Sequence, residues 1–202
     1  MAHSERSIRQ SADLGRTRAT QLVPCVSDLL TIPHVCGLST RPKLPFVQAT
    51  RLTRLIKAPR AAVYAALLDP RSVRSWMVPD SMTSHIHSFD AREGGTFRIS
   101  LTYNQPTTAG KSSVQTDTFH GRFVKLVQDT EIVQVVEFET NDPALRGEMV
   151  ISYILTDTDG GTLVIGRHEN LPPAVSPSDN ELGWSMSMTK LARLVEAPPA
   201  QP

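Results

Sequence analysis

The clearest pattern of hydrophobic and polar positions runs from Thr96 to Tyr103, where the two kinds alternate strictly. Such alternation is typical of a strand with one buried and one solvated face. The apolar face holds Phe97, Ile99, Leu101 and Tyr103, and the polar face holds Thr96, Arg98, Ser100 and Thr102. Gly94-Gly95 precedes the strand, and glycines permit the positive φ that a tight hairpin turn needs. The segment therefore predicts a half-buried strand entered through a turn.

Several other segments predict short strands. A first strand is expected over 51–57, and later candidates cover 84–90, 96–104, 116–127, 132–139, 148–156 and 162–169. Turn-rich joints separate them, such as Gln128-Asp129-Thr130 and Asp159-Gly160-Gly161. Consecutive short strands joined in this way favour an antiparallel meander. The stretch 104–113, which contains Pro, Gly and Thr, is expected to be a mobile hairpin tip.

Two short helices are predicted between the first strand and the meander. Ala58-Pro59 places a proline where a helix can start without losing a backbone hydrogen bond. An apolar stripe at helical spacing follows, made by Val63, Tyr64, Leu67 and Leu68. Asp69-Pro70 ends this helix, because the residue before a proline is pushed out of the helical region. Residues 71–76 can then form the second helix.

A longer amphipathic helix is predicted near the C-terminus. Ser178 is expected to cap its first amides while Glu181 reaches back to the cap residue. Large apolar residues then recur at intervals of four, three and four residues, at Trp184, Met188, Leu191 and Val195, and form one apolar stripe. The helix is expected to end before Ala197-Pro198. A stripe of this kind must pack on something apolar, and the curved sheet is the large candidate.

Composition adds the domain organisation. The formal net charge of +1 gives no reason to expect nucleic acid or an acidic membrane as a partner. Residues 1–47 hold six Lys/Arg against three acids, together with Cys25 and Cys36, whereas 48–202 hold fifteen against seventeen. We expect residues 1–47 to be a disordered, dispensable extension, 48–197 to be one domain and 198–202 a disordered tail. A segment docked on the domain, or a targeting peptide, are the alternatives for 1–47.

The environment of the chain follows from two further observations. No run reaches the roughly 20 apolar residues that span a bilayer, so no membrane insertion is expected. A domain region without cysteine fits a reducing cytosol, and a cytoplasmic location is predicted.

Several of these segments together resemble the activator of heat-shock-protein 90 ATPase family, within the START-like or SRPBCC superfamily. The resemblance covers about 48–197 and rests on Ala58 to Leu67, Asp69-Pro70 with Trp76, Glu93 to Phe97, Gly161-Thr162-Leu163 with His168 and Leu171-Pro172, and Gly183-Trp184 with Lys190-Leu191. It implies an α+β helix-grip fold, in which a curved antiparallel sheet wraps around the long C-terminal helix. Two short helices follow the first strand, and a cavity lies between helix and sheet.

Pockets of this kind are mostly apolar with a few polar groups. Given the implied fold, the apolar candidates for the cavity lining are Trp76, Phe97, Tyr103, Trp184 and Met188. The polar candidates are His120, Glu137 and His168. For each aromatic side chain the alternative is that it only fills the core.

Histidines are the other candidates for chemistry. His85 and His87 share a strand face, but nothing adjacent supplies a third ligand, so a solvated face is expected and no metal is predicted. His168 is either an acid or base or a structural histidine bonded to a neighbouring strand or to the Pro172 loop. Glu169 cannot easily orient it, because adjacent strand residues point to opposite faces. Nucleophile, phosphate-binding and dinucleotide motifs are all missing, so no cofactor is predicted.

Three functions remain open at this point. The leading hypothesis is binding of a small hydrophobic or amphipathic ligand between the C-terminal helix and the sheet, with no catalysis or only latent catalysis. The second is a co-chaperone that stimulates a heat-shock ATPase, and the third is an enzyme of the polyketide cyclase or hydratase kind. The resemblance also leaves open a heat-shock chaperone partner and a homodimer.

Overall fold

A computed structural model of the chain describes residues 48–106 and 110–197. The extension predicted over 1–47, the tail predicted over 198–202 and the centre of the predicted hairpin tip lie outside these residues. Within them the chain forms seven strands, three α-helices and one 3-10 helix. In chain order these are β1 Gln48–Ile56, α1 Arg60–Leu68, α2 Pro70–Trp76, β2 Met82–Phe89, β3 Thr96–Tyr103, β4 Thr116–Val127, β5 Glu131–Phe138, η1 Pro143–Leu145, β6 Met149–Thr158, β7 Gly161–Leu171 and α3 Pro177–Glu196.

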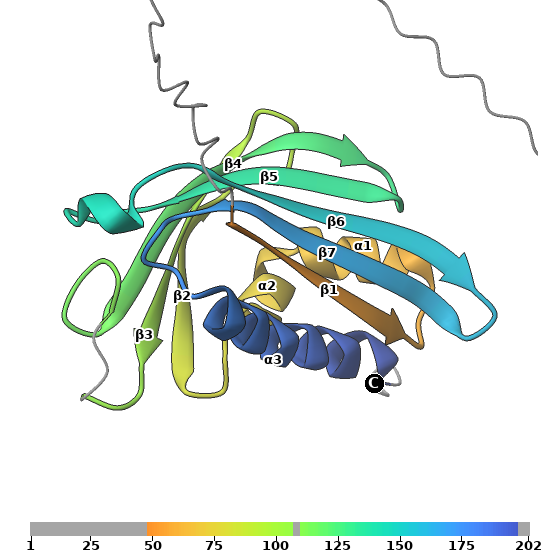
Figure 1. Cartoon of the computed structure of the whole chain (residues 1–202). Coiled ribbons are helices and arrows are strands. Elements are labelled where there is room, and N and C mark those ends of the chain that lie inside the picture. The colour runs from red at the N-terminus through yellow and green to blue at the C-terminus, as the bar shows by residue number, and fades with distance from the viewer. Residues whose placement is uncertain (1–47, 107–109, 198–202) are drawn as a thin grey trace, which may run out of the picture. The chain divides into compact units, whose positions relative to one another are not determined.

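The seven strands form one antiparallel sheet in the order β1-β7-β6-β5-β4-β3-β2. Strands β2 to β7 follow one another as a meander, and β1 closes the far edge by pairing with β7, where Leu52 lies opposite Gly166. The sheet is strongly curved, and all three α-helices lie on its concave side (Figure 1). Helix α3 crosses the open side of this curve, so the predicted helix-grip arrangement is confirmed.

Local sequence explains where most elements begin. Gly94 adopts a φ of +75° in the turn before β3, as expected from Gly94-Gly95. Asp69 ends α1 and caps α2, because its side chain accepts a hydrogen bond from the Ser72 amide at 2.8 Å. The predicted cap of α3 is wrong by two residues. Ser176 accepts from the Asp179 amide, and Pro177 opens the helix because its fixed φ and missing N–H suit the first helical position.

The core fills the space between helices and sheet. The α3 stripe packs into it as predicted, with Trp184, Met188 and Leu191 all buried and Val195 packed against them. Arg54 of β1 donates to Thr189 of α3 at 2.9 Å, which ties the helix to the edge of the sheet.

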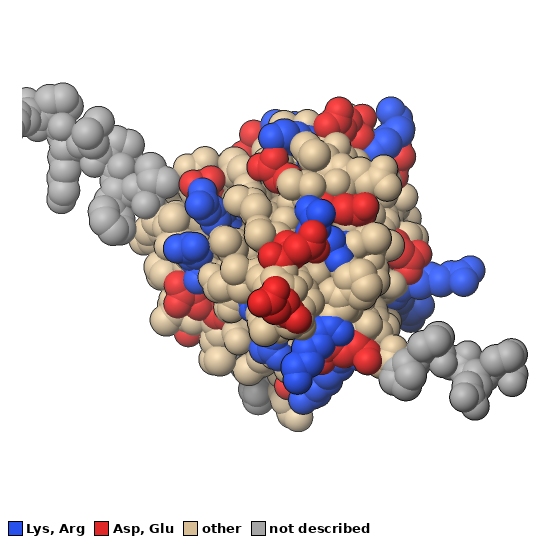
Figure 2. Space-filling model, turned by 90° about the vertical axis from the view of Figure 1, so that its right-hand side faces the viewer, with Lys and Arg blue, Asp and Glu red and all other residues tan. Residues whose placement is uncertain are grey.

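The surface carries both signs of charge. On the face that Figure 2 shows, Lys and Arg side chains are interspersed with Asp and Glu, without a large area of one sign. None of the helices in the described residues is long and apolar enough to cross a membrane.

Candidate functional site

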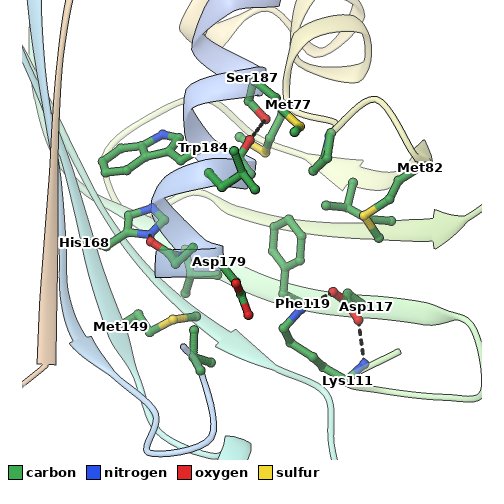
Figure 3. Close-up of a pocket in the computed structure, with 18 of the residues that line it drawn as sticks. Met77, Met82, Lys111, Asp117, Phe119, Met149, His168, Asp179, Trp184 and Ser187 are labelled. Atoms are coloured by element: carbon green, nitrogen blue, oxygen red, sulfur yellow. Dashed lines mark hydrogen bonds and ion pairs between the residues drawn. The ribbon is translucent and has the colours of Figure 1, made fainter. Parts of the chain in front are cut away.

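A cavity of about 510 Å³ lies between α3 and the concave face of the sheet. The 76–82 segment after α2 borders it on one side, and the turn that leads into α3 borders it on the other. Most side chains on its wall are apolar, including Leu101. Figure 3 shows Met77, Met82, Phe119 and Met149 among them. Its size falls within the 300–1,000 Å³ range that is usual for small-molecule pockets.

Aromatic rings form the inner wall of this cavity. The Tyr153 ring meets Trp76 and Trp184 edge to face, with centroid distances of 6.4 and 5.9 Å. The His168 ring stacks on Trp184 at 4.0 Å. The Trp184 ring can lie close to β7 because residue 166 is a glycine, whose missing Cβ would stand 2.4 Å from the Trp184 Cζ2 atom. Glycine is therefore needed here for close packing of the helix on the strand.

His168 is the polar group of this inner wall. Its Nδ1 lies 3.0 Å from the Asn180 Oδ1 of α3, which also accepts the Thr50 hydroxyl at 2.7 Å. The partner expected from sequence, a neighbouring strand or the Pro172 loop, is therefore wrong, because α3 rather than the loop covers this face. Burial lowers the pKa of His168 to about 4, and the bond to Asn180 offsets only part of this. The imidazole is therefore neutral at pH 7.

A second polar cluster lies at the other end of the cavity. The Lys111 ammonium and its backbone amide both bond to the buried Asp117 carboxylate at 2.5 Å, and the Tyr103 hydroxyl approaches it at 3.4 Å. Burial acts to lower the pKa of Lys111, but Asp117 and then Tyr103 outweigh it and leave the pKa raised. Lys111 thus stays charged and paired with Asp117 (Figure 3).

The sequence-predicted candidates divide into three groups. Trp76, Tyr103, His168 and Trp184 line the cavity. Phe97 and Met188 do not line it and are almost fully buried in the core. Phe97 lies over Gly121, where a Cβ would approach its ring to 2.5 Å, and packs on Phe123 at 5.2 Å between centroids. Met188 lies one turn beyond Trp184, where α3 is already packed on the core.

The remaining two candidates, His120 and Glu137, face away from the cavity. They lie opposite each other on β4 and β5, and they line a smaller surface hollow of about 130 Å³ on the outer face of the sheet. Strand alternation is the reason, because Phe119 and Phe138 next to them point into the cavity instead. Their assignment to the same pocket as His168 is therefore wrong.

The outer face carries the other predicted histidines too. His85 and His87 are exposed, with ring centroids 4.6 Å apart, and His87 Nε2 lies 2.8 Å from the Ser100 hydroxyl. Across the described residues, no group of three or more His, Cys, Asp or Glu side chains could hold a metal ion.

Several polar cavity residues were not assigned to the pocket by sequence reasoning, among them Lys111, Asp117 and Gln134. Asp117 and Gln134 are almost fully buried and point inward from β4 and β5. A polar residue at an inward position of an otherwise apolar alternation was the available signal for Gln134. The sequence around Lys111 carried no comparable signal, because its contact with Asp117 depends on how the chain before β4 folds back onto that strand.

The comparisons with known proteins agree with this architecture. Residues 57–196 match the family described as "Activator of Hsp90 ATPase homolog 1-like protein". None of the curated proteins compared matches the sequence.

Solved structures are similar over about three quarters of the chain. Protein CV1439 of Chromobacterium violaceum is 31% identical with a TM-score of 0.67, over 74% of this chain and 98% of that one. The AHSA1-like protein of Aeromonas hydrophila is 18% identical with a TM-score of 0.54, over 74% and 92%. DynU16, from the dynemicin biosynthetic locus, is 19% identical with a TM-score of 0.53, over 74% and 47%. The last two show the fold alone. The chain belongs to the family of activator of Hsp90 ATPase homolog 1-like proteins.

Proposed function

We propose that the protein binds a small hydrophobic or amphipathic molecule in the cavity between α3 and the sheet. The observation that carries this proposal is the space of about 510 Å³, whose walls are mainly apolar and include several aromatic and methionine side chains. Such a space is large enough for a molecule of drug size, and apolar walls supply most of the binding free energy in pockets of this kind.

The electrostatics of the cavity favour binding over proton transfer. A general acid or base works best when its pKa lies near the operating pH. Three groups on the cavity wall are instead shifted away from neutrality. The pKa of His168 is lowered to about 4 by burial, that of Tyr153 is raised by burial, and that of Lys111 is raised beside Asp117. These groups are suited to hold a ligand in one orientation.

The direct test is native mass spectrometry of freshly purified protein, followed by titration with N-phenyl-1-naphthylamine, an uncharged fluorescent probe of apolar cavities. We expect a co-purifying small molecule or saturable, one-to-one probe binding. Leu101→Trp fills the cavity because Leu101 lines it, whereas Thr102→Trp places the same ring on the outer face of the same strand. Only the first variant is expected to lose binding.

Two results would contradict the proposal. One is a wild-type protein that carries no small molecule and takes up no probe. The other is equal binding by the Leu101→Trp and Thr102→Trp variants, which would put the ligand elsewhere.

Catalysis of the cyclase or hydratase kind is the alternative, and it is tested with cyclisable apolar substrates. Loss of an essential acid or base typically lowers the rate on the order of 10² to 10⁴. Reproducible turnover that disappears in His168→Gln but survives in His120→Gln, on the outer face, would establish an enzyme. Stimulation of a heat-shock ATPase would be seen directly by adding the protein to that ATPase. A cytoplasmic location belongs to the same proposal and is checked by cell fractionation.

A further inference from the structure

Gln134 is a buried amide inside the apolar cavity. It projects from β5 onto the concave face, lines the cavity and is only 5% exposed. Ile132 and Val136, its neighbours on the same face of β5, are apolar. Among the residues that the structure describes, the Gln134 side chain makes no hydrogen bond, and its amide is not one of the fully enclosed unpaired groups, so it faces the open space of the cavity. An amide in this position bonds to whatever fills the cavity, whether water or a ligand.

A second hydrogen-bonding group lies in the same row of the sheet. Ile151 pairs with Gln134 on one side and with His168 on the other. Two strand spacings of about 4.8 Å therefore place Gln134 and His168 roughly 10 Å apart, on either side of Ile151. Asn180 Oδ1 accepts from His168 Nδ1, so a neutral imidazole carries its hydrogen there and keeps Nε2 as an acceptor. The row offers an amide donor, an amide acceptor and an imidazole acceptor.

The charges on the cavity wall argue against an anionic ligand. Lys111 is the one Lys or Arg among the described lining residues, and its ammonium is bound to Asp117 at 2.5 Å. Asp179 lines the cavity as well, is exposed and makes no ion pair within the described part of the chain. Figure 3 shows its carboxylate between His168 and Lys111. A carboxylate or phosphate would therefore lie near the Asp179 carboxylate and would have to share the Lys111 ammonium with Asp117.

These observations, resting on the proposed function, identify the ligand class. We infer that the cavity takes an uncharged apolar molecule that presents a hydroxyl, carbonyl or carboxamide group to Gln134. The apolar body of the ligand lies against the aromatic walls, and the Gln134 amide makes the hydrogen bond that the protein itself leaves open. A fatty acid, whose carboxylate is anionic at pH 7, is disfavoured by the same charges.

A matched set of three probes tests this inference: naphthalene, 2-naphthol and 2-naphthoate, measured by equilibrium dialysis at pH 7. They share one ring system and differ in having no polar group, a neutral hydroxyl or a carboxylate. We expect 2-naphthol to bind on the order of fivefold to tenfold more tightly than naphthalene, as one net hydrogen bond allows. We expect 2-naphthoate to bind more weakly than either.

The variant Gln134→Leu keeps the size of the side chain and removes its amide. It should abolish the advantage of 2-naphthol over naphthalene while naphthalene binding stays within about twofold. Gln128→Leu makes the same exchange at an exposed turn residue. It should change neither the affinity for naphthalene nor the advantage of 2-naphthol. Gln134→Met repeats the test with a second apolar side chain.

The outcomes separate the two proposals. If 2-naphthoate binds most tightly, or if 2-naphthol keeps its advantage in both Gln134 variants, the inference on ligand class is wrong while ligand binding stands. If none of the three probes binds to the wild-type protein, the proposed function fails with it.

Discussion

His168 provides a quantitative test of the cavity, because burial keeps its imidazole neutral at pH values where a solvated histidine is protonated. We consider the exchange His168→Phe, which keeps a ring against Trp184 but can neither take up a proton nor bond to Asn180. Burial holds the pKa of His168 at about 4 in the folded protein, against 6.5 for a solvated histidine. The unfolded chain therefore binds a proton at a pH where the folded protein does not.

The sign and size of the effect follow from this difference. Below pH 6.5 protonation favours the unfolded chain, so the free energy of unfolding falls as the pH falls toward 4. At about 1.4 kcal/mol per pH unit, the gap between 6.5 and about 4 corresponds to a loss of about 3 kcal/mol from this one group. About 2 kcal/mol of it should be lost by pH 5.

The loss of unfolding free energy is measured by urea unfolding at pH 7.5, 6, 5 and 4.5, followed by tryptophan fluorescence. The Asp and Glu side chains make the same contribution to the pH dependence of stability in wild type and variant. The difference between the two plots of unfolding free energy against pH therefore isolates the effect of His168. We expect the wild type to lose about 2 kcal/mol more than His168→Phe between pH 7.5 and 5. His120→Phe, on the outer face, should follow the wild type. Parallel curves for wild type and His168→Phe would refute a buried, neutral His168.

Other substitutions test the packing around the cavity. Gly166→Ala should lower the free energy of unfolding by about 1 to 3 kcal/mol and shift the tryptophan emission, because the new methyl group would stand 2.4 Å from Trp184. Gly160→Ala would make only an ordinary contact at 3.5 Å, so its effect on the free energy of unfolding should be far smaller. Trp184→Ala should cost about 3 kcal/mol in urea unfolding, since the buried ring also borders an existing space. Lys111→Met should cost about 1 to 3 kcal/mol by leaving the Asp117 carboxylate buried without its cation, and Asp117→Leu in the same chain should restore part of it. Equal losses in the single and double variants would contradict that pairing.

The sequence by itself determined the elements and the general architecture. Alternation from Thr96 to Tyr103, the prolines at 59 and 70 and the stripe of α3 act through neighbouring residues, so local patterns report them directly. The resemblance of these segments to a family then supplied the helix-grip fold. Even locally, competing signals shifted a boundary, since Pro177 starts α3 before the predicted cap at Ser178.

Only the tertiary structure decided which polar groups share the cavity. Strand alternation separates inward from outward positions but does not say which of the two sets faces the helix, and His120 and Glu137 proved to be on the outer set. The row of Gln134, Ile151 and His168 joins residues from three strands, and their alignment depends on the register of two pairings. Register and burial are properties of the assembled sheet, because they arise from contacts between residues far apart in the chain.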